Sequence, residues 1–506
     1  MNNIKHIVYL MLENRSFDSV LGYLYENDSP EHFIPVGNKN PFDGINKDCW
    51  NPDKLGNQIP AFKINPAPNI EIPSVDPNEE FQHVQKQMKN NMKGFFLDYS
   101  IVNSQHTKEI MACYSPASLP VLNSLAKQFA VSDWYFSSIP TQTNCNRAFS
   151  LTGNSIGSYD SGNSHKRTAM VNNYWLKSPP NTLDPYQFTE RCIFQVLEEE
   201  KIDWAVFYNQ KWPGISIIQG NYCFTQDLLW PTMKNYSNKF KGIEEFYAHA
   251  RQGTLPSFSY LEPAWYEEWN GYGHNGNDYH PPGNVSPGEK FLYQLYQQLK
   301  SSPNWKNTLL IINFDEHGGT YDHITPPGNV NAPWQNPADG TQPPDDYDIT
   351  FGFTQLGVRV PLILVSPLID AKTIFRPLKN ENAFDHTSVI ATILKHFNID
   401  KSKWQLGSRV ANAPTFEHVI TLTPETARMD AEVDAPIDGT SIPATQTAPT
   451  ELQRMIIHRM LHLYARQRNI HSKAVEEIHK KYCLSPQNMP ELGKQVQNAI
   501  DALNQL

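Results

Sequence analysis

One apolar run that ends in ionisable residues constrains this chain more than any other segment. Residues 309–314 (LLIINF) are apolar at five of six positions, and Asp315, Glu316 and His317 follow directly. Such a run is typical of a strand buried on both faces, as in a parallel sheet. Open α/β sheets carry their chemistry just beyond the carboxyl ends of these strands. Because adjacent buried carboxylates are costly without a cation, we expect a divalent metal at this point.

The beginning of the chain repeats the pattern. Residues 6–12 (HIVYLML) form a second short apolar run, and Glu13 and Asn14 follow it. Two strands that both end in oxygen ligands indicate neighbouring strands directed at one ion. A carboxylate and an amide suit zinc, manganese, magnesium or calcium. Asn14 or Ser16 could instead cap a following helix.

Composition and charge exclude several classes of function. The 506 residues carry a formal net charge of −10, which argues against nucleic acid as a substrate. The absence of an 18-residue apolar stretch predicts that the chain is not transmembrane. We expect no Sec signal peptide, and therefore a cytoplasmic protein or export by another route, with a host cell as one destination. Six cysteines without CxxC spacing predict free thiols rather than a cysteine zinc site.

The order of predicted elements indicates an α/β fold. Strands are expected at 6–12, 129–131, 203–208, 309–314 and 359–366, and helices at 79–92, 119–128, 193–201, 288–301 and 387–396. Their alternation predicts a mostly parallel central sheet with helices on both faces. We expect one domain over 1–422, a linker or draped segment over 423–450, and a helical region over 451–506. The basic helix at 451–481 would pack on the main body or touch anionic lipid.

We expect the nucleophile that the metal would activate in residues 140–147 (PTQTNCNR). Metal coordination can activate a hydroxyl, which is a poor nucleophile at its ordinary pKa. Thr143 at the start of a helix would also lie where backbone N–H groups hold phosphate. It could instead serve only as an N-cap.

Several segments together resemble a known family. They include HIVYLMLENRSFDSVLGY, CYSPASLPVLNSLAKQFAVSDWYFSSIPTQTNCNRAF, NDYHPP, DEHGGTYDHITPP, LGVRVPLILVSP and FDHTSVIATIL, in the order in which the family has them. The chain resembles the bacterial phosphatidylcholine-type phospholipase C and acid phosphatase (phosphoesterase) family, a branch of the alkaline phosphatase-like superfamily. The resemblance covers roughly residues 4 to 415 and leaves the C-terminal part unmatched.

The resemblance implies a role for individual residues. Glu13, Asn14, Asp315 and Glu316 would ligate the metal together with Thr143, which would be the nucleophile. Zinc is the favoured metal, with calcium and manganese as alternatives. His280, in NDYHPP, would contact the phosphate and protonate the leaving group.

The chain departs from the family pattern at two positions. Cys145 stands where the family usually has proline, which leaves the nucleophile in place. Glu79 stands where the D-P-x-H segment has a phosphate-facing histidine, so either His83 one turn later replaces it, or the carboxylate recruits a further cation.

Other polar residues near the motifs have two interpretations. Asp278, Asp322, His323, Asp385 and His386 would complete a second metal site or contact phosphate, or else would orient loops by hydrogen bonding. We expect His317 to support the metal ligands rather than to bind the ion.

The function implied is phospholipase C, which releases diacylglycerol and a phosphorylated head group from a phospholipid membrane surface through a phosphothreonine. Trp265, Tyr266 and Trp269 would enclose a choline group by cation–π contact, unless they only pack the loop. An acid phosphatase acting on monoesters and a catalytically inactive lipid-binding protein are the alternatives. The sequence leaves protein partners open.

Overall fold

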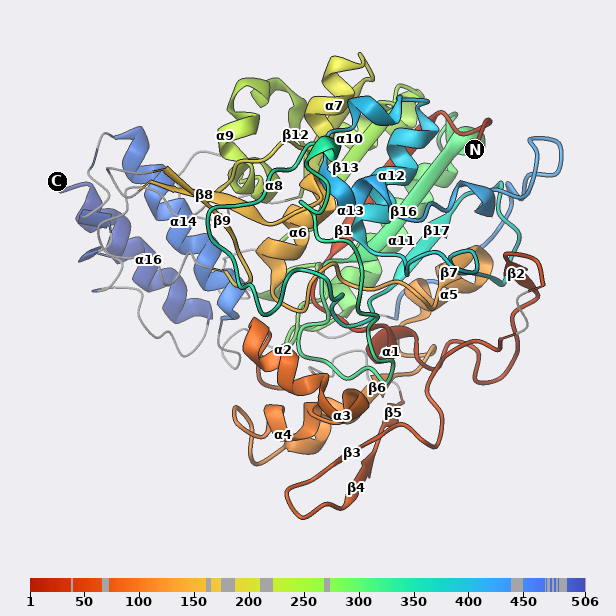
Figure 1. Ribbon diagram of the computed structural model, residues 1–506, viewed down its shortest axis with the longest axis horizontal. Helices are drawn as coiled ribbons and strands as arrows, with labels where there is room; N and C mark the ends of the chain where they lie inside the picture. Colours follow the sequence, from red (N-terminus) through yellow and green to blue (C-terminus); the bar gives the residue numbers. More distant parts are fainter. Residues whose placement is uncertain are drawn as a thin grey trace.

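A central sheet organises the molecule (Figure 1). The computed structural model describes residues 1–37, 40–65, 72–160, 165–173, 187–209, 222–267, 274–437, 449–468, 470, 474, 475, 477, 478, 481 and 489–505. Within these residues the sheet has nine strands. In spatial order they are β12 (Phe240–Gly242), β11 (Trp204–Tyr208), β13 (Phe258–Glu262), β1 (His6–Leu12), β16 (Thr308–Phe314), β17 (Leu362–Val365), β7 (Ala130–Ser132), β18 (Thr373–Phe375) and β2 (His32–Ile34).

The predicted mostly parallel α/β architecture is confirmed. β17 runs antiparallel to both of its neighbours, and the other pairings in this sheet are parallel. Two groups of helices flank the sheet (Figure 1). One group contains α6 (Thr143–Thr152), α7 (Ile193–Glu199) and α12 (His386–His396); the other contains α5 (Pro120–Gln128), α10 (Ile243–Gln252) and α11 (Ser286–Lys300).

The two strands that the sequence singled out lie side by side at the centre. β1 and β16 pair in parallel with Leu12 opposite Phe314, so both strands end at the same edge. Every residue of β16 is buried. Full burial of a large aliphatic or aromatic side chain contributes about 1.5–3 kcal/mol. The buried side chains of these two strands therefore hold their carboxyl ends firmly in position.

A small helical lobe lies beside the main body, below the sheet in Figure 1. We use this name for the hairpin of β3 (Trp50–Pro52) and β4 (Gln58–Pro60) together with residues 72–111, which contain α2 (Phe81–Gln87), α3 (Lys89–Met92) and α4 (Phe95–Tyr99). The lobe has its own hydrophobic core around Val84, Phe95 and Tyr99. The short strands β5 (Phe62–Ile64) and β6 (Ala112–Tyr114) pair where the lobe joins the body.

The C-terminal part packs against the rest of the protein. Residues 423–437 lie along the body, where the Ala431 carbonyl accepts a hydrogen bond from the Tyr296 hydroxyl. α14 (Glu451–Gln467) contacts α16 (Met489–Leu503). Leu452, Met455 and Ile456 of α14 are buried, so this face of the helix packs on the protein, which is the first of the two predicted alternatives. The division into three regions stays a prediction.

Candidate active site

The ends of β1 and β16 bring the predicted metal ligands together. Asn14 has a φ of 48°, a conformation that asparagine tolerates better than most residues, and its backbone N–H donates to Asp315 Oδ1 at 3.1 Å. The Asp315 side chain also accepts from the backbone N–H of Glu316. Glu13, Asn14, Asp315 and Glu316 are all inaccessible to solvent. The turn after β16 needs Gly318 at φ 58°, because a Cβ there would lie 2.4 Å from the Asn14 carbonyl oxygen.

Thr143 lies at the same place, as its position at the start of α6 predicted. Its hydroxyl donates to Glu13 Oε2 at 3.1 Å and lies 3.3 Å from Asn14 Oδ1. Gln142 is the N-cap residue, but its side chain makes no capping hydrogen bond, so Thr143 is the first helical residue and not the cap. The nucleophile candidate is therefore next to two ligand candidates.

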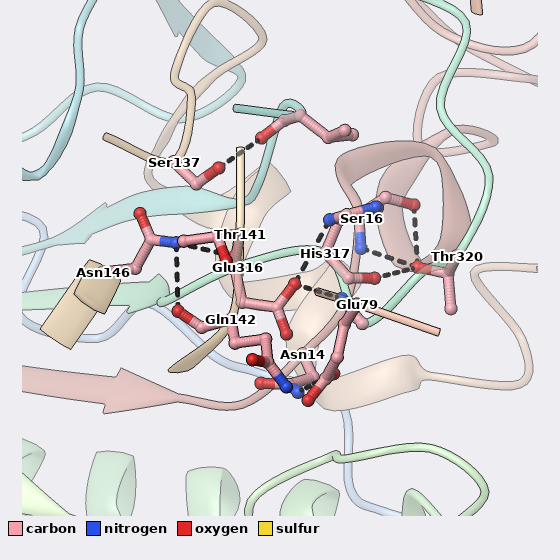
Figure 2. A network of polar contacts seen from close by, with 12 residues as sticks. Asn14, Ser16, Glu79, Ser137, Thr141, Gln142, Asn146, Glu316, His317 and Thr320 are labelled. Carbon is pink, nitrogen blue, oxygen red and sulfur yellow. Dashed lines mark hydrogen bonds and ion pairs between the residues drawn. The ribbon is translucent and has the colours of Figure 1, made fainter. Parts of the chain in front are cut away.

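Asn146 holds the loop that presents Thr143, a role that the sequence did not reveal. Its side-chain amide donates to the carbonyl oxygens of Ile139, Thr141 and Gln142, and Figure 2 shows it beside the last two. Its Oδ1 accepts from the Ile139 N–H. The only sequence signal was the spacing of an amide three residues after the threonine.

Arg147, one turn after Thr143, is the second residue that the sequence did not assign. Its Nε donates to Glu13 Oε1 at 2.6 Å and lies 3.5 Å from Asp315 Oδ2. The guanidinium also lies 4.9 Å from the centre of the Trp265 ring. Arg147 is fully buried, and it offsets part of the negative charge of the carboxylates.

The carboxylates nevertheless outnumber the cations in this site. Burial raises the pKa of Glu13 well above its ordinary value, although Arg147 opposes the shift, and it raises the pKa of Asp315 to about 6. Asp315 Oδ2 and Glu316 Oε1 are buried without a hydrogen-bond partner in the described part of the chain. Oxygen donors of this kind, left unpartnered and short of positive charge, fit a divalent metal ion.

Glu79 lies inside the site, at the position of the family histidine. Its Oε2 accepts a 2.7 Å hydrogen bond from Asn14 Nδ2, and the two side chains meet in Figure 2. Burial, reinforced by Glu316 and Asp76, raises its pKa well above the ordinary value. His83, the suggested substitute, turns away and contacts Asp98 Oδ1 at 2.8 Å. The carboxylate, not His83, thus stands beside the predicted ligands.

His280 is buried next to these carboxylates. Its Nδ1 donates to the Pro281 carbonyl at 2.5 Å and lies 4.0 Å from Asp76 Oδ1, which leaves Nε2 without a hydrogen-bond partner among the described residues. Burial lowers its pKa to about 4, so the ring is neutral near pH 7 with a free lone pair on Nε2. The neighbouring Asp278 holds this loop, because its Oδ1 accepts from the His280 N–H and its carbonyl from the Glu13 N–H.

His317 supports a metal ligand, as expected. Its Nδ1 lies 3.2 Å from Glu316 Oε2, and its Nε2 lies 2.8 Å from Gln87 Oε1 in α2. Figure 2 shows His317 beside Glu316. Thr320, which bonds both the His317 carbonyl and Ser16, fixes the turn that carries it.

Four of the five residues suggested for a second metal site or a phosphate contact lie in two separate networks, and Asp278 lies in the loop of His280. Asp322 pairs with Arg359, and His323 Nδ1 lies 2.6 Å from Asp18 Oδ2. Asp385 caps α12 and bonds Ser138 and Arg409, while His386 Nε2 contacts the Phe314 carbonyl. Ligand atoms of Asp18, Asp322 and His323 lie within 4.8 Å of one another, a spacing that a metal ion could use. Arg359, however, already contacts both aspartates.

The predicted aromatic cage is described only in part. Trp265 is buried, and its ring lies over Arg147 and 5.1 Å from the Phe224 ring. Tyr266 belongs to the short strand β14 (Tyr266–Glu267), and Trp269 lies outside the described residues.

The start of α14 covers the site. Asn144, next to Thr143, donates from Nδ2 to Met455 Sδ at 3.3 Å, and Gln453 donates to the Trp265 carbonyl at 3.2 Å. The Glu451 N–H donates to Asp76 Oδ2. The C-terminal helix, which was predicted to pack on the main body or to touch anionic lipid, thus contacts residues next to the catalytic groups.

Comparison with known proteins places the chain in a family. The phosphoesterase family model matches residues 4–400. Non-specific phospholipase C6 of Arabidopsis thaliana is 32% identical, over 90% of this chain and 79% of that protein. Phospholipase C A of Mycobacterium tuberculosis is 26% identical, over 79% of this chain and 74% of that protein.

Among solved structures, a protein of the alkaline phosphatase superfamily from Vibrio parahaemolyticus aligns with 60% of this chain and 66% of its own, at 13% identity and a TM-score of 0.31. In the described part of the chain, no helix combines the length and the apolar character needed to cross a bilayer. The family match over residues 4–400 and the phospholipase C relatives lead to one conclusion: the chain belongs to the phosphoesterase family and is a phosphoric diester hydrolase.

Proposed function

We propose that the protein is a metal-dependent phospholipase C that cleaves glycerophospholipids, phosphatidylcholine among them, to diacylglycerol and a phosphorylated head group. The observation that carries the proposal is the position of the Thr143 hydroxyl between Glu13 and Asn14, beside carboxylate oxygens that accept no hydrogen bond from the described residues. The relatives named phospholipase C supply the substrate class.

The metal would be held by Glu13, Asn14, Asp315 and Glu316 together with Thr143. Zinc is our first choice, and calcium and manganese remain alternatives for these oxygen donors. When bound, the ion would lower the pKa of the Thr143 hydroxyl and polarise a phosphoryl oxygen. Arg147 keeps Glu13 and Asp315 oriented, and His317 does the same for Glu316.

The first half-reaction would form a phosphothreonine. Thr143 Oγ1 loses its proton to solvent and attacks phosphorus, and the bond from phosphorus to the diacylglycerol oxygen breaks in line. The leaving oxygen takes a proton from His280. His280, which is neutral in the free site, takes up this proton from solvent when a bound phosphodiester anion raises its pKa.

The second half-reaction would release the head group. Water attacks the phosphothreonine and gives a proton to the now neutral His280, while the bond from phosphorus to Thr143 Oγ1 breaks and Oγ1 takes up a proton from solvent. The products are the phosphorylated head group and free Thr143. Recognition of choline by Trp265, Tyr266 and Trp269 stays a prediction, and the contact of Trp265 with Arg147 gives that residue a supporting role as well.

Product analysis on phosphatidylcholine vesicles tests the proposal. Metal-stripped protein should be silent, and zinc-restored protein should release diacylglycerol and phosphocholine. Thr143→Ala should lower turnover by at least about a thousandfold, while Thr143→Ser, which keeps a hydroxyl, should retain measurable activity. Full activity of Thr143→Ala would remove the nucleophile from the proposal.

Other outcomes would point to the two alternatives. Release of phosphate from a simple monoester, with no lipid product, would favour an acid phosphatase. Vesicle binding without either reaction, in zinc-loaded protein, would favour an inactive lipid-binding protein.

A further inference from the structure

The helical lobe exposes apolar side chains on its outer side. Leu97 is 38% exposed, Ile101 64% and Val102 37%, although Phe95, Phe96 and Tyr99 of the same segment are buried. The segment from α4 to Val102 therefore contributes buried side chains to the core of the lobe and also has apolar side chains that are exposed to solvent. The β3–β4 hairpin, whose strand β3 contacts α4, exposes Leu55 at its turn.

The segment 81–108, which carries these side chains, contains four lysines, and Glu80 and Glu109 flank it. Lys86, Lys89 and Lys108 are exposed in the same segment, whereas the chain as a whole has a formal net charge of −10. Asp98 is the one acidic residue of the sequence between 81 and 108, and it is buried and bonded by His83 and Gln87. An apolar surface bordered by lysines is complementary to lipid phosphates above an acyl layer.

The lobe is also joined directly to the active site. Gln87 of α2 contacts His317, and Glu79, just before α2, bonds Asn14. At its base, the Tyr99 hydroxyl bonds the backbone of Val75, next to Asp76. A membrane held by this surface would therefore lie against a part of the molecule that carries site residues.

The C-terminal helix α14, which the sequence also suggested for lipid contact, is a weaker candidate for a membrane-binding surface. Leu452, Met455 and Ile456 of α14 point into the protein, where they close the site. The basic character of that helix is thus not joined to an exposed apolar face among the side chains that the structure describes.

We propose that the outer surface of the helical lobe, formed by Leu97, Ile101 and Val102 with Lys86, Lys89 and Lys108, docks the enzyme on a phospholipid bilayer. The apolar side chains enter the boundary between head groups and acyl chains, and the lysines bind phosphates. This docking surface rests on the proposed phospholipase function for its purpose, but its binding is measurable without catalysis.

The test uses the full chain and three sets of variants. Leu97→Glu/Ile101→Glu places carboxylates on the apolar surface, and Lys86→Glu/Lys89→Glu reverses the charge beside it. Val36→Glu is the matched control, because Val36 is 96% exposed and follows β2 at the far edge of the sheet (Figure 1). Co-sedimentation with phosphatidylcholine vesicles, with and without phosphatidylserine, measures binding, and thermal melting confirms that each variant is folded.

We expect the first variant to weaken binding to both vesicles at least about tenfold, and the lysine variant to weaken binding most with phosphatidylserine. Val36→Glu should bind as the natural protein does. Hydrolysis of vesicles should fall with binding, while hydrolysis of a monomeric short-chain phosphatidylcholine should stay within about twofold.

Two results would overturn the docking surface. One is unchanged vesicle binding in the folded lobe variants. The other is an equal loss on vesicles and on the monomeric lipid, which would assign the lobe to the catalytic site alone. Failure of the proposed function looks different, because the natural protein would then hydrolyse neither lipid while the binding comparison still gives its answer.

Discussion

We compare two groups of carboxylates in the described part of this molecule, because their negative charge is balanced in different ways. In the first, around Thr143, Arg147 faces Glu13 and Asp315, and two carboxylate oxygens have no hydrogen-bond partner in the described structure. In the second, which we call the arginine network, Arg359 pairs with Asp18 and Asp322, and Arg376 pairs with Asp133. His323 contacts both Asp18 and Asp43.

The two groups of carboxylates therefore have different roles: the arginine network stabilises the fold, and the group around Thr143 carries the chemistry. In the arginine network each carboxylate meets a cation of the chain itself. The pKa of the half-buried Asp43 lies below its ordinary value, because His323 and Arg359 stabilise its charge, whereas burial raises the pKa of Asp322 to about 6 although Arg359 opposes the shift. In the active site, burial raises the pKa of Glu13 and Glu79 well above the ordinary value. A network that is neutralised internally holds loops together, whereas one left negative requires a cation from outside.

Removal of Arg359 should have the largest effect on stability. Arg359→Met leaves Asp322 buried without its cation and Asp18 with His323 as its remaining partner, so we expect the free energy of unfolding to fall by about 3–5 kcal/mol in urea denaturation. Arg191→Met, which breaks an exposed pair with Glu199, is the control and should cost less than about 1 kcal/mol. An equal decrease in the free energy of unfolding in the two variants would show that the buried pairs of Arg359 stabilise the protein no more than an exposed pair does.

Metal removal should act on the active site only. At a free zinc concentration a hundredfold above its dissociation constant, binding should add about 2.7 kcal/mol to the stability. Thermal melting with zinc and with a chelator measures this gain. A similar gain in Asp315→Asn would show that the ion binds elsewhere, for example near Asp18 and Asp322.

The variant Asp315→Asn should have opposite effects on activity and stability. It removes a ligand, so turnover should be lost, but it also removes a buried charge that Arg147 only partly balances. In metal-free protein we expect it to be as stable as the natural chain or more stable, by up to about 2 kcal/mol. A loss of about 3–5 kcal/mol, as expected for Arg359→Met, would mean that the carboxylates around Thr143 are neutralised within the chain in the same way as those of the arginine network.

The arginine network should also give a dependence on pH. Burial alone would lower the pKa of His323, but Asp18 and Asp43 raise it to about 12, far above its value in the unfolded chain. This contribution to stability is therefore complete below about pH 6.5 and declines as the pH rises towards the folded pKa.

Between pH 7 and 9 the slope should be at most about 1.4 kcal/mol per pH unit. Urea denaturation across this range measures it, and His323→Gln should flatten the curve. An identical slope in His323→Gln would show that other groups titrate.

The sequence predicted the part of the site that follows strands. The strand over 6–12 is observed as predicted, and Glu13, Asn14, Asp315 and Glu316 meet because two parallel strands end at one edge. Thr143 could be placed by its motif. These features are local, or they follow from a general rule of α/β sheets.

The remainder depends on tertiary contacts that no local pattern encodes. Arg147 could have pointed to solvent from α6, and only the fold turns it towards Glu13. The strand β13 (Phe258–Glu262) was not predicted, because FSYLE is short and half polar. Burial also decides the protonation of His280, which the motif alone could not indicate.

The covering of Thr143 by α14 has a consequence for how the protein acquires its activity. Groups that bond across the site are far apart along the chain: Asn14 and Asp315 are separated by 301 positions, and Asn144 and Met455 by 311. Contacts of such long range form late and slow the folding of a chain. The catalytic centre would thus be among the last regions to form, and a partly folded chain would have little capacity to attack lipids before it is complete.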